Sequence, residues 1–323
     1  MTYIEAEKRL YNTCVANIEA VNRELVRVYV KAQKELLVML VSYQKRAIED
    51  RIPAQEFRIN ALYQQIDAEI DKVFTESLGI IRNGYVANFE IAYYNHAYNI
   101  ERAVNLDLTV GNYALNFPVL PVSAIETVLN ESLGGFKLVD RWGEITANAK
   151  YRMRGLVAEA ITKGDTLKKL AAELKSMDGW VDGYVNRSMV VARTEMLRAY
   201  SYGSDEARKE AEAAGVEFQY KWSSLFDART RDDHVIMNGR PATITDGEPV
   251  FTLPDGSKGA GPRMSGLSAK EVINCRCRRL DLPYGIEPTS RSARLPDGDY
   301  VEIPFNENAQ AWIEKNYGKK FKK

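Results

Sequence analysis

Residues 2–50 read TYIEAEKRLYNTCVANIEAVNRELVRVYVKAQKELLVMLVSYQKRAIED and decide the first half of the fold. Their apolar side chains recur at three- and four-residue steps, which is the spacing of a single stripe on a helix. The stripe comprises Ile4, Tyr11, Cys14, Ile18, Val21, Leu25, Val28, Ala32, Leu36, Met39, Tyr43 and Ala47. Since no Pro or Gly interrupts it before Pro53, one helix on the order of 70 Å long is predicted, at 1.5 Å per residue. So narrow a stripe needs a partner helix, as in a coiled coil.

The partner is expected next in the sequence. Pro53 suits the first turn of a new helix, and the residues from Phe57 to Leu78 continue the helical period. Gly84 is expected to break or bend this helix before a third stretch, Tyr85 to Asn105. An antiparallel helical hairpin or bundle is therefore predicted, followed by a connector from Leu106 to Pro121.

The middle of the chain also indicates helices. The residues Ser123 to Glu126 have the pattern of a capping box and predict the start of a short helix that Gly134 ends. Further helices are predicted at about Asp140–Thr162, Thr166–Ser176 and Asp182–Ala214.

The pattern changes at Gly215. Val216, Phe218, Tyr220 and Trp222 alternate with polar residues, which is typical of a half-buried strand. Gly and Pro are then frequent and the apolar runs are short, so a small sheet with many loops is predicted. The fold class is α+β, with a long N-terminal helical hairpin or bundle before a loop-rich domain of helices and a small sheet. We predict three parts: a helical arm (1–120), a central domain (121–288, with its motifs at about 167–280) and a C-terminal extension with a lysine-rich tail (289–323).

Composition excludes several classes. The 44 basic and 44 acidic residues balance, so net charge gives no case for nucleic-acid binding. The three cysteines do not resemble a secreted disulfide framework, and the N-terminus lacks the apolar core of a signal peptide. No apolar run approaches the roughly 18 residues of a membrane span. We expect a protein made in a reducing cytoplasm, or packaged from one.

Basic residues are nevertheless concentrated in two places. One lies between Gly256 and Leu280, where Glu271 is the one acid; the other is the C-terminal tail. Most charge runs are solvated faces. The residues that would contact DNA phosphates, without sequence specificity, are Lys315, Lys319, Lys320, Lys322, Lys323, Arg276, Arg278 and Arg279.

Histidine and cysteine supply the candidate chemistry. His96 is expected to be a surface or packing residue, whereas His234 follows the aromatic strand directly. Cys275 and Cys277 are two residues apart and would point to the same face of a strand. With His234 they could bind zinc as a structural ion, with Asp227 or Asp233 as a fourth ligand. The alternative is that the cysteines are reduced core residues and that His234 makes a hydrogen bond in a turn.

The predicted helix from Asp182 carries Arg193 and Glu195, which are two residues apart and cannot share one face. Each could join a buried network of ion pairs with the charged residues of the segment Asp227–Asp233. Alternatively, Glu195 or Asp227 would act as a general base beside His234. No nucleophile elbow, phosphate loop or paired-carboxylate signature supports a specific reaction.

Together, these pieces resemble the phage Mu protein F-like family, also called the phage head morphogenesis or minor head protein family. The resemblance covers about Leu167 to Leu280 and depends on the order of its motifs. They are Ala192-Arg193-Thr194-Glu195, Trp222, Asp227-Ala228-Arg229-Thr230-Arg231, His234, Asn238-Gly239, Phe251, Gly261-Pro262 and Asn274-Cys275-Arg276-Cys277.

The resemblance implies a virion component present in few copies. It implies association with the portal protein and with major capsid or scaffold proteins, in procapsid assembly, genome packaging or DNA ejection. The protein would lie inside the phage head, and in the host cytoplasm during assembly. The helical arm would contact proteins and the basic segments would contact double-stranded DNA. No cofactor is required for such a role.

Some members of this family are fused to toxin enzymes at the C-terminus. Only residues 278–323 follow the cysteine motif here, which we expect to be too few for such a domain. A structural and assembly protein is therefore predicted rather than an enzyme. The rival interpretation is a phage-borne nuclease or transferase that uses Glu195, Asp227 and His234.

Overall fold

The computed structural model describes residues 1–49, 56–107, 113–163 and 181–321. The predicted helix Thr166–Ser176 lies outside these residues. The chain divides into two compact units that alternate along the sequence. Unit 1 comprises Met1–Asn17, Tyr85–Gly135 and Thr194–Lys323, and unit 2 comprises Ile18–Gly84 and Phe136–Arg193. The domain boundaries given above stay a prediction.

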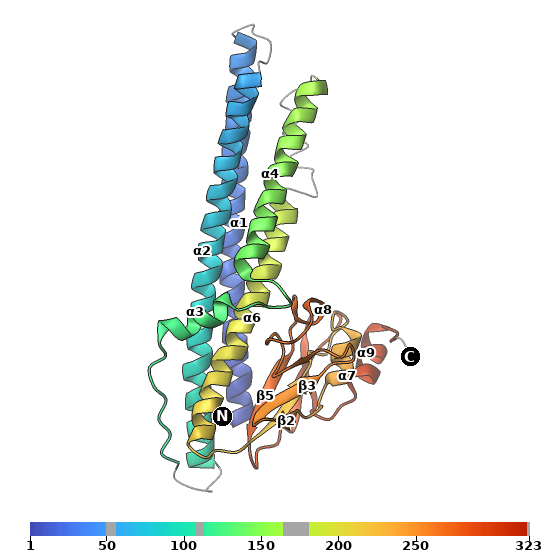
Figure 1. Ribbon diagram of the computed structural model, residues 1–323. Coiled ribbons are helices and arrows are strands. Elements are labelled where there is room, and N and C mark those ends of the chain that lie inside the picture. The colour runs from blue at the N-terminus through green and yellow to red at the C-terminus, as the bar shows by residue number, and fades with distance from the viewer. Residues whose placement is uncertain (50–55, 108–112, 164–180, 322–323) are drawn as a thin grey trace. The chain divides into compact units, whose positions relative to one another are not determined.

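Two long helices run through both units. Helix α1 (Tyr3–Glu49) confirms the predicted first helix, and α2 (Glu56–Arg102) is its antiparallel neighbour (Figure 1). The predicted break at Gly84 is wrong, because α2 continues through it to a short π-helix, η1 (Ala103–Asp107). A glycine inside a helix costs only about 1 kcal/mol relative to alanine. The fully buried neighbours Ile81 and Tyr85 supply packing that offsets this cost.

Unit 2 is a bundle of helices around Phe74. Parts of α1 and α2 pack there with α4 (Leu138–Lys163) and the start of α6 (Val181–Ala213). The Phe74 ring meets the rings of Tyr29, Trp142 and Tyr184 at centroid distances of 5.7, 5.7 and 6.0 Å. Trp142 Nε1 donates to the Phe74 carbonyl at 2.7 Å, and the hydroxyls of Tyr29 and Ser188 are 2.8 Å apart. These contacts join all four helices, which confirms a bundle.

Unit 1 contains the ends of α1 and α2 and most of α6. Asn88 on α2 donates to the carbonyls of Cys14 on α1 and Met196 on α6, at 3.3 and 3.1 Å. At Gly203 of α6, a Cβ atom would lie 2.4 Å from the Phe89 carbonyl oxygen, so only glycine allows this close approach. The three helices form one side of unit 1.

The short helix α3 (Val122–Asn130) confirms the predicted element but not its start. Its N-cap is Pro121, whose side chain makes no capping hydrogen bond, and Ser123 lies inside the helix. The predicted capping box is therefore wrong. Gly134, with a φ of 61°, lies in the turn that follows the helix, where a side chain would clash with Ala269.

Small antiparallel sheets complete unit 1. Strand β1 (Phe218–Ser223) pairs with β5 (Arg278–Pro283), with Trp222 opposite Arg279. A second sheet has the order β2 (Thr243–Thr245), β3 (Glu248–Thr252), β4 (Lys258–Gly259), and β6 (Ser290–Arg294) pairs with β7 (Tyr300–Pro304). The short helices are α7 (Asp232–Met237), α8 (Ala269–Val272) and α9 (Ala309–Tyr317). These elements confirm the α+β class.

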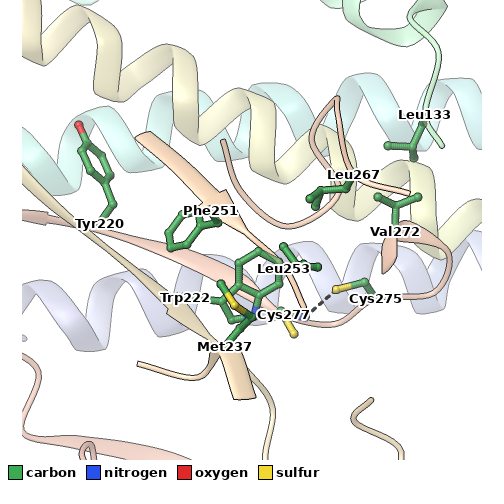
Figure 2. Packing of buried hydrophobic residues seen from close by; sticks show 10 residues of the cluster. All are labelled: Leu133, Tyr220, Trp222, Met237, Phe251, Leu253, Leu267, Val272, Cys275 and Cys277. Atoms are coloured by element: carbon green, nitrogen blue, oxygen red, sulfur yellow. Dashed lines mark hydrogen bonds between the residues drawn. The ribbon is translucent and has the colours of Figure 1, made fainter. Parts of the chain in front are cut away.

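Among the apolar clusters of unit 1, two are central to the small sheets and the C-terminal segment. The first is the central core of unit 1, formed by Leu133, Tyr220, Trp222, Met237, Phe251, Leu253, Leu267, Val272, Cys275 and Cys277 (Figure 2). In the second, Trp312 and Ile313 of α9 pack with Phe226, Val235 of α7 and Ala293 of β6. The C-terminal segment therefore shares a core with the strands before it.

None of the helices in the described ranges combines the length and the apolar character that a membrane span requires.

Candidate metal centre

The centre is built against the indole of Trp222. Strand β1 places this side chain in the central core, where it is fully buried. Its ring meets Phe251 and His234 edge-on, at centroid distances of 5.4 and 5.6 Å. The backbone of Trp222 also pairs with Gly239, whose N–H donates to the Trp222 carbonyl at 2.8 Å. The turn Asn238-Gly239 thus fixes the end of α7, which carries His234.

Asp227 organises the turn that leads into α7. Its carboxylate accepts from the Arg229 N–H at 3.0 Å and from the Thr230 hydroxyl at 3.2 Å. Both guanidinium NH groups of Arg276 also donate to it. Burial opposes ionisation, but the hydrogen bonds and charge of Arg276 lower the pKa of Asp227. The proposed role of Asp227 as a metal ligand is wrong, because this carboxylate accepts two hydrogen bonds from Arg276.

Asp233, the other suggested fourth ligand, contacts a different residue. Its carboxylate lies 3.5 Å from Nζ of Lys270. Neither aspartate belongs to the group of donor atoms around His234.

Cys275 and Cys277 lie in the connection between α8 and β5, not within a strand. The strand argument for their common direction is therefore wrong, and local backbone geometry replaces it. Asn274 has a left-handed φ of 55°, and its N–H donates to the Thr194 hydroxyl at 2.9 Å. The buried Arg263 guanidinium donates to the carbonyls of Cys275 and Cys277 at 3.0 and 2.6 Å. These contacts fold the connection so that both thiols face His234.

The three side chains form one buried cluster. Nδ1 of His234 lies 3.3 Å from Sγ of Cys277 and 3.6 Å from Sγ of Cys275. All three donor atoms lie within 4.8 Å of one another, and each residue is at most 2% exposed. The Cys277 N–H donates to Sγ of Cys275 at 3.4 Å (Figure 2). The structure thus brings together the His and Cys residues that the sequence grouped.

Glu271 is the functional residue that the sequence analysis missed. Its Oε2 lies 2.7 Å from Nε2 of His234, and the carboxylate is almost fully buried. A carboxylate there holds the ring and fixes the proton on Nε2. The sequence feature that could have pointed to Glu271 is that it is the one acidic residue in the basic stretch between Gly256 and Leu280.

The protonation of the cluster follows from its neighbours. Burial opposes a charge on His234, but the hydrogen bond and charge of Cys275 and the charge of Glu271 raise its pKa. Burial also opposes a thiolate at Cys275, but Cys277, His234 and Arg263 lower the pKa of this thiol. Burial and the neighbouring Cys275 raise the pKa of Cys277. Cys275 is therefore the thiol that most readily becomes a thiolate.

A small cavity adjoins the cluster. It has a volume of about 20 Å³, which is enough for about one water. Its lining residues are Leu225, Arg229, Thr230, Arg231, His234, Asn274, Cys275, Arg276 and Cys277. The arginines give this cavity a polar and positively charged wall.

The suggested general bases lie in ion pairs. Glu195 on α6 is fully buried, and its carboxylate lies 3.4 Å from Arg198 on the next turn. Glu271, rather than Glu195 or Asp227, is the carboxylate that contacts His234. Arg193 lies half-buried on the same helix as Glu195. Glu195 forms a buried ion pair with Arg198, whereas the expected partners were the charged residues of the segment Asp227–Asp233.

The remaining motif residues support the architecture. Asn238 Oδ1 accepts from the Ser224 N–H at 3.1 Å and from Arg291 at 2.6 Å. Arg231 donates to the Ile273 carbonyl, which joins the start of α7 to the segment before Cys275. Arg229 is largely exposed beside Asp227.

Two of the suggested DNA-binding arginines are structural. Arg276 pairs with Asp227, and Arg279 pairs with Asp205 and Asp281 at 2.6 and 2.5 Å. Arg278 lies over the Tyr11 ring, 5.7 Å from its centroid. Because carboxylates pair with Arg276 and Arg279, these two arginines are less suited than free cations to contact phosphate, and the DNA contact stays a prediction.

The tail lysines differ among themselves. Lys319 lies 2.9 Å from Asp232 and donates to the Thr230 carbonyl, whereas Lys315 and Lys320 are exposed. Lys322 and Lys323 lie outside the described residues. Lys315 and Lys320 are therefore the described tail lysines best placed to contact phosphate.

His96 is a buried residue rather than a surface one. Its Nδ1 lies 2.9 Å from Glu7 and its Nε2 lies 3.7 Å from Asp281. Burial opposes protonation, but these two carboxylates outweigh it and raise the pKa of His96. This group ties α1, α2 and β5 together within unit 1.

Comparison with known proteins finds similarity to one family and to two curated proteins. Residues 152–280 match the family described as Phage Mu protein F like protein. A protein of Bacillus phage SPP1, minor head protein GP7, is 32% identical over 119 residues, which are 37% of each chain. An NAD(+)–arginine ADP-ribosyltransferase, EFV, of Enterococcus faecalis is 24% identical over 290 residues, which are 90% of this chain and 54% of that protein. No solved structure matches the chain.

The matched segment contains Trp222, His234, Glu271 and both cysteines of the cluster. Among the curated relatives that match, the SPP1 protein is named as a minor head protein. Over residues 152–280 the chain is related to the Phage Mu protein F like family, which confirms the resemblance predicted from the sequence. The chain spans about half the length, or less, of the curated relatives that it matches.

Proposed function

We propose that the chain is a minor head protein that associates with the portal and capsid of its phage and acts in procapsid assembly and in genome packaging or delivery. The observation that carries this proposal is the family match over residues 152–280, which encloses the whole metal centre. The name of the SPP1 relative, a minor head protein, supports it independently. On this proposal the protein resides inside the phage head and, during assembly, in the host cytoplasm.

The helices of unit 2 are our candidates for the protein contact. Val38 and Val41 lie one turn apart on α1 and are 61% and 52% exposed. Residues three apart on a helix are neighbours on its surface, so these side chains form a small apolar contact point. Two exposed valines are too few to identify a partner alone. Val38 and Val41 are nevertheless the first residues to substitute in a test of this contact.

The test is copurification with the portal protein encoded by the same phage. We expect a tagged portal to retain the full chain. We expect the double variant Val38→Asp/Val41→Asp to bind at least ten-fold more weakly, which corresponds to a loss of about 1.4 kcal/mol in binding free energy. The matched control is Ile244→Asp, because Ile244 is 56% exposed on β2 of unit 1. No retention of the wild-type chain would contradict the proposal. Equal retention of both variants would contradict only the assignment of the contact to α1.

A second candidate function is an NAD-dependent transferase activity. The similarity to the ADP-ribosyltransferase over 290 residues favours it, although that name describes a protein of which this chain covers 54%. Against it, both suggested bases lie in ion pairs, Asp227 with Arg276 and Glu195 with Arg198. The test is transfer of labelled ADP-ribose from NAD to arginine. Turnover that Glu195→Gln abolishes would favour the enzyme over the assembly role.

A further inference from the structure

We propose that His234, Cys275 and Cys277 bind one zinc ion, with a water in the adjoining cavity as the fourth ligand. The ion would join α7 to the connection between α8 and β5. It depends on residues of unit 1 alone and is independent of the partners proposed above.

The spacing of the donor atoms fits zinc. Zinc bonds of about 2.3 Å to sulfur and 2.0–2.1 Å to nitrogen, at tetrahedral angles, place a bound nitrogen and sulfur about 3.6 Å apart. The observed distances from Nδ1 of His234 are 3.3 Å to Cys277 and 3.6 Å to Cys275. Both nitrogen–sulfur distances are therefore within a few tenths of an ångström of those at a zinc site.

The histidine is oriented as a ligand. Glu271 contacts Nε2, so the proton of the neutral ring resides there and the lone pair of Nδ1 points to the two sulfurs. This carboxylate–histidine pairing is the usual outer support of a metal-bound imidazole. A histidine that only filled space in the core would not need a buried carboxylate on the opposite nitrogen.

Charge also favours the ion. Two thiolates and the Glu271 carboxylate bring three negative charges to a site where each residue is at most 2% exposed. Zn²⁺ offsets two of them, and the buried guanidinium of Arg263, 3.6 Å from Sγ of Cys275, offsets the third. Both thiols lose their protons on binding, so uptake of one Zn²⁺ releases up to two protons to solvent.

The fourth position is assigned to water because the cavity of about 20 Å³ is lined by all three ligands and has room for about one water. Its other polar walls include Thr230 and Asn274. Within the described residues, no carboxylate joins the three donors as a fourth ligand.

The experiment is metal analysis of the full chain, purified under reducing conditions from zinc-supplemented cells. We expect about one equivalent of zinc in the wild type. We expect about a tenth of that or less in Cys277→Ser and His234→Gln, because the loss of one of three ligands opens the site. The matched control is Cys14→Ala, which removes the one cysteine outside the cluster and should keep the full equivalent.

Cobalt exchange gives a readout that does not depend on variant folding. Wild-type protein in which Co²⁺ replaces zinc should show sulfur-to-cobalt charge-transfer absorption and the intense visible bands of four-coordinate cobalt. Wild-type protein without bound metal after zinc refolding, or without sulfur-to-cobalt absorption, would overturn the proposal. A full equivalent of zinc in Cys277→Ser would also overturn it.

Discussion

The carboxylate of Glu271 lies 2.7 Å from Nε2 of His234, while the two cysteine sulfurs lie at the other nitrogen of the same ring. One imidazole thus connects a buried acid to two buried thiols. In the neutral ring, a proton on Nε2 shared with Glu271 would leave the lone pair of Nδ1 facing the sulfurs.

The first prediction concerns this acid. Glu271→Gln keeps the size of the side chain but removes the charge that supports the imidazole. Loss of an outer-shell partner of a metal-bound histidine typically weakens metal affinity by about 10–100-fold. We expect a loss of this size in competition with a chelator of known affinity. Glu287→Gln is the control, because Glu287 is 59% exposed and pairs with Lys221 on the surface. Equal affinities of the two variants would mean that Glu271 does not support a ligand.

The second prediction concerns the helical bundle of unit 2. Leu25 on α1 is fully buried, so Leu25→Asp places a charge in the apolar seam. The cost should exceed the about 2–5 kcal/mol typical of a buried Leu→Ala change. The neighbouring Val26 is 37% exposed, and Val26→Asp should cost far less. Thermal unfolding followed by circular dichroism measures both. Similar midpoints for the two variants would argue against the packing of α1 in this bundle.

The third prediction concerns pH. Glu7 and Asp281 raise the pKa of His96 above its ordinary value despite burial and the opposing charge of Arg279. The protonated form therefore stabilises the fold fully below about pH 6.5, and this contribution is lost as the pH rises through the folded-state pKa. Each unit by which the pKa is raised corresponds to about 1.4 kcal/mol. We expect His96→Gln to be less stable than wild type in acid, with the difference shrinking as the pH rises. Denaturant unfolding across this range measures it, and a difference that grows with pH would contradict the assignment.

The fourth prediction concerns DNA. Lys315→Ala/Lys320→Ala removes two exposed charges and leaves the packing of Tyr317 and Phe321 on the core intact. If both lysines contact phosphates, the slope of log affinity against log salt should fall by about 0.9 for each. Binding to a non-specific duplex, measured by fluorescence anisotropy at several salt concentrations, checks this. Lys209→Ala is the control, because Lys209 pairs with Asp205 and Glu206 on α6. An unchanged slope would mean that Lys315 and Lys320 do not contact DNA phosphates.

The helices were predictable because their apolar period is local. The period from Ile4 to Ala47 needs no knowledge of distant residues, and α1 follows it closely. Gly84 misled the prediction because the cost of one glycine is small beside the packing of its buried neighbours in α2. The local apolar period therefore predicted the positions of the helices well, but single residues such as Gly84 did not predict where a helix ends.

The candidate metal centre was only partly predictable. The pairing of His234 with the cysteines followed from residue types, but the strand argument for their direction was wrong, since a left-handed Asn274 and the Arg263 guanidinium orient the thiols instead. Asp227 was proposed as a ligand because nothing in the sequence reveals that Arg276, 49 residues later, donates hydrogen bonds to its carboxylate. Such long-range ion pairs depend on the fold and leave no periodic signal.

The most direct test of the central claim is the protein content of purified phage heads. Quantitative mass spectrometry of intact particles should find this chain at a few copies per portal ring, retained after washing at high salt, and the same chain should be present in procapsids before DNA is packaged. Its absence from both particles, with the protein recovered only in the free cytoplasmic fraction of infected cells, would contradict a role as a minor head protein.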